Sequence, residues 1–431
     1  PIFDQANDET KMSFNWGYNP ANYNALEGGY STDPYNGYAR VKEFKDFVKA
    51  YHDAGMNIIM DVVYNHMNGA AGSAFDVLMP GYYFRYNTDG TLSNGSGCGN
   101  ETASEMYMMQ KFMIDSTCFL AKEYKLGGFR FDLMGLHDLE TMEKIAAALK
   151  AIDPNIVVYG EPWQGGTSTL ADSQTAKQDN MAKYKGYGAF NDKMRDALIK
   201  GGLNSASAKG WVTSTSNPQS SDLDAIKAGI KGSVKVSSGE VSDPDKVVNY
   251  VTCHDNYTLY DRIKAAGITD AATIKKMAML ANSVVFTSNG TTFMLAGEEF
   301  LRTKGGNSNS YNASYKVNEL DYSLKVKNLD MMENYKKLLA LKQTCSGLAL
   351  GTGPNNNVVA DTSKGNVISY SVTDSTSGRT YMIYHCNGAN SGSLPSVDLS
   401  GYTLYLDTIN GSKALSSSTK LESFETLIAY K

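Results

Sequence analysis

The feature that most constrains the fold of this chain is the repeated alternation of a helical pattern with a short apolar run that ends in polar residues. An amphipathic pattern over residues 41–54 is followed by a nearly continuous apolar run over 56–63, which leads into Asn65 and His66. The same order recurs twice before residue 163. This rhythm is typical of parallel strands that are covered by helices. The sequence therefore predicts an α/β fold, with an α/β barrel as the leading candidate.

Six apolar runs fit this rhythm as strands. They lie at residues 56–63, 129–133, 156–159, 187–190, 247–253 and 292–296. Residues 1–4 resemble the tail of one more strand. Because a closed (β/α)8 barrel needs eight strands, either two strands lie outside this chain or the pattern does not reveal them.

Two stretches of the sequence depart from this rhythm. Residues 201–245 are rich in Ser, Gly, Lys and Asn and show little periodicity, which indicates an excursion of loops and short helices. Residues 351–431 consist of short alternating runs separated by Gly, Ser and Asn, which predict a small antiparallel β-sandwich. The expected domains are therefore a barrel over residues 1–350 and a sandwich over 351–431.

Charge and cysteine usage exclude several classes of protein. The net charge is only −5 and the basic residues are scattered, so the chain lacks the electrostatic footprint for nucleic acid or an anionic membrane. No apolar run approaches the ~20 residues that a membrane helix needs. The five cysteines form no CxxC pair and no zinc-ligand spacing. A neutral or small ligand fits these properties better.

Polar side chains gather where the predicted strands end. They are Asp61, Asn65 and His66 on the first run, Arg130 and Asp132 on the second, Glu161 on the third, and His254 and Asp255 on a later one. One such residue alone is more often a helix cap or a satisfied core residue. Catalytic groups collect at the carboxyl ends of parallel strands, so the repetition predicts an active site there.

The residue types at these strand ends suit glycoside hydrolysis, in which one carboxylate attacks the sugar and another carboxyl group donates a proton. Arg130 lies two residues before Asp132 on the same strand face, and its positive charge would hold Asp132 ionised and nucleophilic. Glu161 stands beside Pro162 and Trp163, and an apolar neighbourhood favours the protonated form that a general acid needs. No metal-ligand spacing and no Ser or Cys nucleophile elbow competes with this interpretation.

Four segments, in order, resemble the signature segments of the α-amylase superfamily, glycoside hydrolase family 13. They are residues 61–66 (DVVYNH), 128–132 (GFRFD), 159–163 (YGEPW) and 251–256 (VTCHDN). Residues 14–20 (FNWGYNP) further resemble the motif of type I pullulanases, which usually has Tyr first and Asp sixth, where this chain has Phe14 and Asn19. Segments 30–34, 95–101 and 296–300 resemble the same subfamily.

The resemblance implies a (β/α)8 barrel, a retaining double displacement, and hydrolysis of α-1,6 branch linkages in pullulan, amylopectin or limit dextrins. Carried over by position, Asp132 becomes the nucleophile, Glu161 the general acid/base, and Asp255 a third carboxylate that holds substrate hydroxyls. A retaining mechanism places the first two carboxyl groups about 5 to 5.5 Å apart.

The same resemblance implies further substrate-binding residues. Arg130, His66 and His254 would bind the sugar before the cleaved bond. Tyr18 would stack on that sugar, Asp61 would support the site, and Trp163 is also expected to bind substrate. The expected partner is therefore an α-glucan, with neither nucleic-acid binding nor membrane insertion.

By comparison with the family, this chain starts at the end of the second barrel strand, so we expect it to lack the first strand and most of the second. We further expect a monomer in an extracellular or cell-surface location rather than the cytoplasm, with the N-terminus of the protein absent from this chain. No cofactor is required for the chemistry, although a structural calcium ion is conceivable at oxygens such as those of Asn65.

Other activities share the four segments, because α-amylases, neopullulanases and isoamylases carry them too. The α-1,6 specificity rests on residues 15–18 almost alone. A barrel that binds glycan without activity is a further alternative, although such proteins usually lose one of the catalytic carboxylates, and Asp132, Glu161 and Asp255 are all present.

Overall fold

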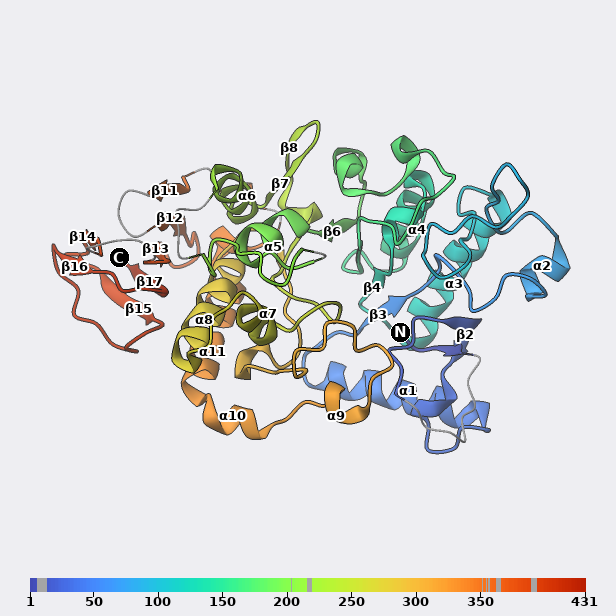
Figure 1. Ribbon diagram of the computed structural model, residues 1–431, viewed down its shortest axis with the longest axis horizontal. Coiled ribbons are helices and arrows are strands. Elements are labelled where there is room, and N and C mark those ends of the chain that lie inside the picture. The colour runs from blue at the N-terminus through green and yellow to red at the C-terminus, as the bar shows by residue number, and fades with distance from the viewer. Residues whose placement is uncertain are drawn as a thin grey trace. The chain divides into compact units, whose positions relative to one another are not determined.

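The computed structural model forms two compact units, Pro1–Phe190 and Asn191–Lys431 (Figure 1). It describes residues 1–5, 14–202, 204–214, 219–350, 352–353, 355, 357–361, 366–388 and 394–431. Residues 203 and 215–218 of the predicted excursion, and residue 351, where the predicted sandwich begins, lie outside the described residues.

The described residues of the first unit include four parallel strands that pair side by side. In spatial order they are β3 (Ile59–Val62), β4 (Gly128–Phe131), β5 (Val157–Gly160) and β6 (Gly188–Phe190). The helices of this unit are α1 (Gly37–Asp53), α2 (Ala74–Leu78), α3 (Tyr107–Tyr124) and α4 (Leu139–Ile152). Since α1, α3 and α4 each precede a strand, the predicted alternation of helix and parallel strand is confirmed here.

Local sequence explains why these elements form where they do. The side chain of Asp138 accepts a hydrogen bond from the main-chain N–H of Thr141, which caps the start of α4. Met142, Ile145 and Leu149 then form a buried stripe at helical spacing. All residues of β4 are buried, and strands β3 and β5 pair with its two edges, so its apolar run is what a central parallel strand requires.

The prediction for residues 1–4 was wrong in one respect. The strand β1 (Phe3–Gln5) is present, but it pairs antiparallel with β2 (Pro20–Leu26) in a two-stranded sheet rather than joining the parallel strands. Phe3 is buried, and its ring lies 5.6 Å from the rings of both Tyr23 and Tyr64. Aromatic packing therefore holds this short strand in place, and a periodic pattern in the sequence does not predict such packing.

The second unit combines helices with several small sheets. Its helices are α5 (Asp192–Ile199), α6 (Ser220–Ile230), α7 (Leu259–Ala265), α8 (Ala271–Phe286), α9 (Tyr315–Asn318), α10 (Ser323–Lys327) and α11 (Leu329–Thr344). Strands β9 (Val247–Asn249) and β10 (Thr291–Thr292) pair in parallel. Strands β7 (Ser233–Val236) and β8 (Gly239–Ser242) form a hairpin inside the predicted excursion, where only loops and short helices were expected.

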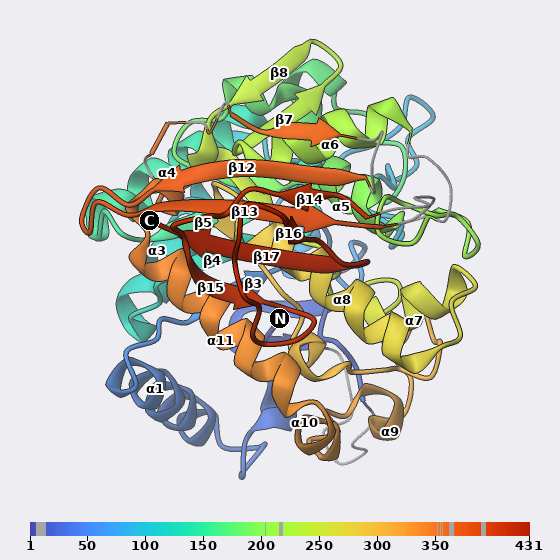
Figure 2. The same cartoon turned by 90° about the vertical axis from the view of Figure 1, so that its left-hand side faces the viewer.

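The last part of the second unit is antiparallel, as the alternating runs predicted. One sheet has the order β11 (Val359–Asp361), β12 (Val367–Thr373), β13 (Thr380–Cys386), β17 (Glu425–Tyr430), β15 (Thr403–Asp407). Figure 2 shows β12, β13, β17 and β15 in this order. A second pair joins β14 (Ser396–Val397) and β16 (Thr419–Lys420). Residues of β12, β13 and β17 share one buried apolar cluster with α8 and α11. The predicted boundary at residue 350 therefore marks a change of secondary structure within one compact unit.

No helix in the described part of the chain combines the length and apolar character that crossing a lipid bilayer requires.

Candidate active site

Arg130, on β4, lies at the centre of a group of carboxylates in the first unit. Its Nη1 atom is 2.8 Å from Asp61 Oδ1 and 3.1 Å from Asp132 Oδ1, and its Nη2 atom pairs with Glu161 Oε1. Asp61 and Arg130 stand opposite each other in the parallel register of β3 and β4. Asp132 and Glu161 follow the ends of β4 and β5 directly. The strand ends therefore bring four of the predicted site residues together.

The carboxyl group of Asp132 is held on both oxygens. Arg130 reaches Oδ1, while the Asn65 amide donates to Oδ2 at 2.8 Å and to the main-chain oxygen of Asp132 at 3.0 Å. Burial nevertheless raises the pKa of Asp132 above its ordinary value; Arg130 opposes this effect, and the negative charge of Asp61 adds to it. Arg130 is thus present as expected, but its charge alone does not determine the ionisation of Asp132.

Glu161 is also buried, with 3% of its surface exposed. Besides Arg130 on Oε1, the main-chain N–H of Leu133 donates to Oε2 at 2.9 Å. Leu133 adopts a left-handed backbone conformation with φ of 41°, which is strained for a residue with a side chain and which orients this N–H. Glu161 therefore meets a positive charge and a donor in addition to the apolar Pro162 expected beside it, and both donors favour its carboxylate form.

Asn65 connects Asp132 to His66. Its Oδ1 atom lies 2.7 Å from His66 Nδ1, while its amide nitrogen serves Asp132. Burial lowers the pKa of His66, which favours the neutral ring, and the Nε2 atom is buried without a hydrogen bond to any described residue. The sequence placed Asn65 among the polar residues at the strand ends and made it a possible source of calcium ligands, but assigned it no part in orienting Asp132. Its position beside His66 in segment 61–66 was the available signal for this second role.

Tyr18 approaches the same cluster from the N-terminal segment. Its hydroxyl donates to Asp61 Oδ2 at 2.5 Å, and its ring centroid is 5.6 Å from the Arg130 guanidinium carbon. Burial raises the pKa of Tyr18, so the hydroxyl keeps its proton at neutral pH. Trp163 is half-buried, and its ring lies 6.5 Å from that of Phe190. The sugar contacts of Tyr18 and Trp163 stay predictions.

His254 and Asp255 belong to the second unit and follow β9. The His254 Nε2 atom is 3.7 Å from Asp255 Oδ2, and its Nδ1 atom is 3.2 Å from the sulfur of Cys253. The Nζ atom of Lys304 donates to the main-chain oxygen of His254 at 2.8 Å. These contacts orient the ring and the main-chain oxygen of His254, and the roles of His254 and Asp255 toward a substrate stay predictions.

No group of three or more His, Cys, Asp and Glu residues is placed to hold a metal ion within the part of the chain that the structure describes. The amide of Asn65 is occupied by Asp132 and His66. The calcium ion that the sequence made conceivable stays a prediction.

Comparison with known proteins yields one consistent result. No protein-family model matches the chain. A pullulanase of Bacillus subtilis strain 168 is 35% identical over 349 residues, which are 80% of this chain and 48% of that protein. A pullulanase of Klebsiella aerogenes is 36% identical over 364 residues, which are 74% of this chain and 33% of that protein. The chain thus spans half or less of the length of these two relatives.

Solved structures agree with the sequence relatives. A pullulanase from Bacillus acidopullulyticus has a TM-score of 0.89 at 36% identity, covering 100% of this chain and 53% of that one. A pullulanase from Paenibacillus barengoltzii, solved in complex with maltohexaose and α-cyclodextrin, has a TM-score of 0.86 at 34% identity and covers 100% of this chain and 68% of that one.

Proposed function

Since this chain belongs to the pullulanase family, we propose that it hydrolyses α-1,6-glucosidic branch linkages of pullulan, amylopectin and limit dextrins by a retaining double displacement. The maltohexaose bound to the related Paenibacillus structure supports an α-glucan as the substrate. Within this chain, support comes from the carboxyl groups around Arg130.

The observation that carries this proposal is one guanidinium group that contacts carboxyl groups on neighbouring strands. Arg130 reaches one oxygen of Asp132 and one oxygen of Glu161. Both carboxyl groups therefore lie within the span of a single side chain, as a mechanism with a nucleophile and a nearby acid/base demands.

In the first step, Asp132 attacks the anomeric carbon of the sugar, and Glu161 gives its proton to the departing glucosidic oxygen. Asn65 and Arg130 orient the two oxygens of Asp132 for this attack. In the second step, Glu161 takes a proton from water, and the water replaces Asp132 at the anomeric carbon. Apart from the glucan and the water, each step uses only groups that this chain supplies.

Glu161 needs an oxygen that is free of donors before it can carry a proton. In the structure, Arg130 and Leu133 occupy one oxygen each. We infer that the contact between Arg130 and Glu161 opens when a glucan enters, so that the glucosidic oxygen takes the place of the guanidinium group. A maltotriose complex in which Arg130 still bonds Glu161 would contradict this step.

Neighbouring residues complete the sugar site. Burial favours the neutral ring of His66, and its Nδ1 atom is engaged by Asn65, so we assign a sugar hydroxyl to its Nε2 atom. Tyr18, anchored by Asp61, offers a ring for stacking on the sugar. We assign Trp163 to the same substrate.

The remaining parts of the proposal concern the second unit and the whole protein. Asp255 is the third carboxylate, which holds substrate hydroxyls, and His254 binds the same sugar. We also propose that the parallel strands belong to a (β/α)8 barrel and that the antiparallel part is a β-sandwich. A monomer outside the cytoplasm, with no cofactor in the chemistry and with calcium in a structural role at most, completes the proposal.

The test is the product pattern on defined glucans. We expect maltotriose from pullulan and little action on amylose, and we expect Asp132→Asn and Glu161→Gln to abolish turnover while pullulan still binds. Cleavage of amylose in preference to pullulan would instead indicate an α-amylase, and binding without any cleavage would indicate an inactive glycan-binding barrel. A Glu161→Gln variant with near-normal turnover would refute the assigned acid/base.

A further inference from the structure

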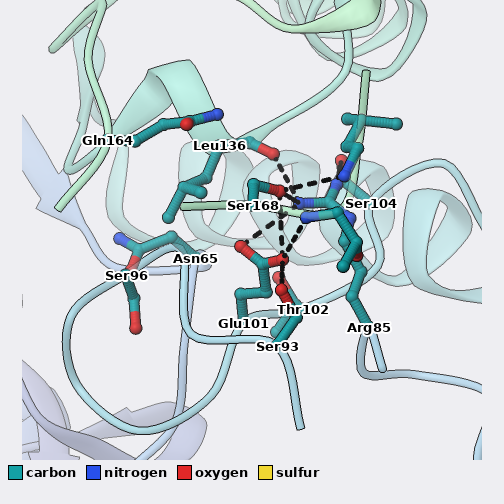
Figure 3. A network of polar contacts seen from close by, with 12 residues as sticks. Asn65, Arg85, Ser93, Ser96, Glu101, Thr102, Ser104, Leu136, Gln164 and Ser168 are labelled. Atoms are coloured by element: carbon teal, nitrogen blue, oxygen red, sulfur yellow. Dashed lines mark hydrogen bonds and ion pairs between the residues drawn. The ribbon is translucent and has the colours of Figure 1, made fainter. Parts of the chain in front are cut away.

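Two loops beside the carboxylate cluster are joined by a buried polar network (Figure 3). We term residues 93–103 the first loop and residues 163–169, which follow β5, the second loop. The main-chain N–H groups of Gly165 and Gly166 both donate to the main-chain oxygen of Gly95, at 3.0 and 2.8 Å. The two loops thus meet backbone to backbone.

This close approach depends on glycine. A Cβ atom at Gly165 would overlap the main-chain oxygen of Ser96, and a Cβ atom at Gly95 would overlap the carboxylate of Glu101. Any larger residue at either position would push the two loops apart. The contact between the loops is therefore specified by the sequence rather than incidental.

Glu101 is the side chain that binds both loops from within. It is fully buried, and its Oε1 atom accepts hydrogen bonds from Ser93 Oγ at 2.5 Å on the first loop and from Ser168 Oγ at 3.0 Å on the second. The N–H of Thr169 approaches the same oxygen at 3.4 Å. The Oε2 atom lies 3.8 Å from Arg85 Nη1. Losing the carboxylate would remove the side-chain contacts that fix the second loop against the first and leave only the main-chain contacts at Gly95.

Arg85 compensates the buried charge and extends the network. It donates to the main-chain oxygen of Leu136 at 2.9 Å and pairs with Glu105 at 2.7 Å. Leu136 ends the short helical turn that follows Asp132, so Arg85 ties that turn to Glu101 (Figure 3). A buried carboxylate with a guanidinium group and several donors is a rigid arrangement.

The network continues to Glu161 through the main chain. The main-chain N–H of Gly135 donates to the main-chain oxygen of Glu161 at 2.9 Å, and the side-chain amide of Gln164 donates to the main-chain oxygen of Gly135 at 3.0 Å. The first loop is bonded to the segment of Asn65, the residue that orients Asp132. The main-chain N–H of Thr102 donates to the main-chain oxygen of Asn65 at 2.9 Å. The loops that Glu101 joins are thus continuous with, or bonded to, the segments that carry both carboxyl groups.

We propose that Glu101 is a positioning residue for Glu161: its buried carboxylate fixes the second loop, and the second loop fixes the backbone from which Glu161 reaches the glucosidic oxygen. This inference rests on the proposed function, since it concerns the proton that Glu161 gives. A proton donor that shifts by about 1 Å loses on the order of 100-fold in rate. Glu101 acts only through the loops and touches no substrate.

The test compares substrates that differ in their need for that proton. Pullulan has a glucosidic oxygen that must be protonated as it leaves, whereas fluoride leaves from α-maltotriosyl fluoride without protonation. Azide added with the fluoride substrate attacks the glycosyl ester on Asp132 without needing a base. The comparison therefore isolates the work of Glu161 from that of Asp132.

The variants are Glu101→Gln, which keeps the size of the side chain, and Ser168→Ala, which removes one contact of the second loop. The matched control is Glu105→Gln, because Glu105 bonds Arg85 in the same network and neither loop. For Glu101→Gln we expect kcat on pullulan to fall about 10- to 100-fold, with the rate on the fluoride in azide nearly retained. Ser168→Ala should show a smaller loss of the same kind.

The outcomes separate the inference from the function on which it rests. An equal loss on both substrates would show that Glu101 serves only the fold, and no loss on pullulan would show that the loops do not position Glu161; either result overturns the inference. Equal selective losses in Glu101→Gln and Glu105→Gln would also overturn it, since the second loop would then not be the cause. If the unmodified protein cleaves neither substrate, the proposed function itself fails.

Discussion

A buried carboxyl group in the second unit should make the stability of that unit depend on pH. Glu298, in the turn after β10, is 3% exposed; its Oε1 atom accepts a hydrogen bond from the Thr252 hydroxyl, and the side chain of Asn282 also lowers its pKa. Burial raises the pKa of Glu298 from its ordinary 4.5 to about 8. The nearby titratable groups are Tyr335 and Glu299. No positive charge offsets the burial among the causes of this shift.

The sign of the effect follows from proton binding. Between pH 4.5 and 8 the folded state keeps the proton on Glu298 and the unfolded state loses it, so the free energy of unfolding falls as the pH rises. When the folded state holds one proton more than the unfolded state, the free energy of unfolding falls by about 1.4 kcal/mol for each pH unit. Between pH 5.5 and 8.5 it therefore falls by about 3 kcal/mol, because the folded state itself releases the proton near pH 8. Glu298→Gln should escape this loss, because its amide stays neutral and can donate to buried acceptors. The variant should therefore gain about 3 kcal/mol relative to the parent over this range.

Urea unfolding at pH 5.5 and 8.5 measures this gain. Trp211 is buried in the main apolar cluster of the second unit, so its fluorescence reports on that unit once Trp16 and Trp163, in the first unit, are replaced by Phe in all variants. Glu333→Gln is the control, because the side chain of Glu333 is 62% exposed on α11 and is solvated in both states. A Glu298→Gln variant whose stability relative to the parent is the same at both pH values would refute the reasoning.

Two further perturbations test other buried contacts. Asn65→Ala should lower kcat on pullulan about 100-fold with a smaller effect on KM, because Asp132 loses the donor that orients it; steady-state kinetics measure this, and a change confined to KM would contradict it. Burial lowers the pKa of His385 to about 3, so below about pH 6.5 the unfolded chain binds a proton that the folded chain does not, and stability falls as the pH drops toward 3. His385→Gln should flatten this acid limb in denaturant unfolding, and an unchanged limb would exclude His385 as its source.

The parallel strands and the central cluster were predictable because both follow from local order. A buried apolar run that ends in polar residues predicts a parallel strand, and adjacent parallel strands align their ends. The meeting of Arg130 with Asp132 and Glu161 is a consequence of that alignment. The hairpin of β7 and β8 was missed although Val234 and Val236 alternate with polar residues, because the strands are only four residues long.

The network around Glu101 was harder to foresee. Arg85 and Glu101 lie in a stretch with no helical or strand period, and nothing in their local sequence shows that they share a buried site. The raised pKa of Asp132 was missed for a related reason. A neighbouring arginine is visible in the sequence, but the burial that outweighs it arises only from the packing of strands and loops.

The charge balance around Arg130 suggests where the catalytic proton comes from. One guanidinium group faces the carboxyl groups of Asp61, Asp132 and Glu161 in a buried setting, so full ionisation would leave two uncompensated negative charges. Burial and mutual repulsion favour uptake of a proton by the group as a whole, and the raised pKa of Asp132 is one expression of this. A retaining glycosidase needs one ionised and one protonated carboxyl group at the same pH. Three carboxyl groups around one guanidinium group favour such a mixture of ionised and protonated carboxyl groups. A glucan that displaces Arg130 from Glu161 would then decide which carboxyl group holds the proton.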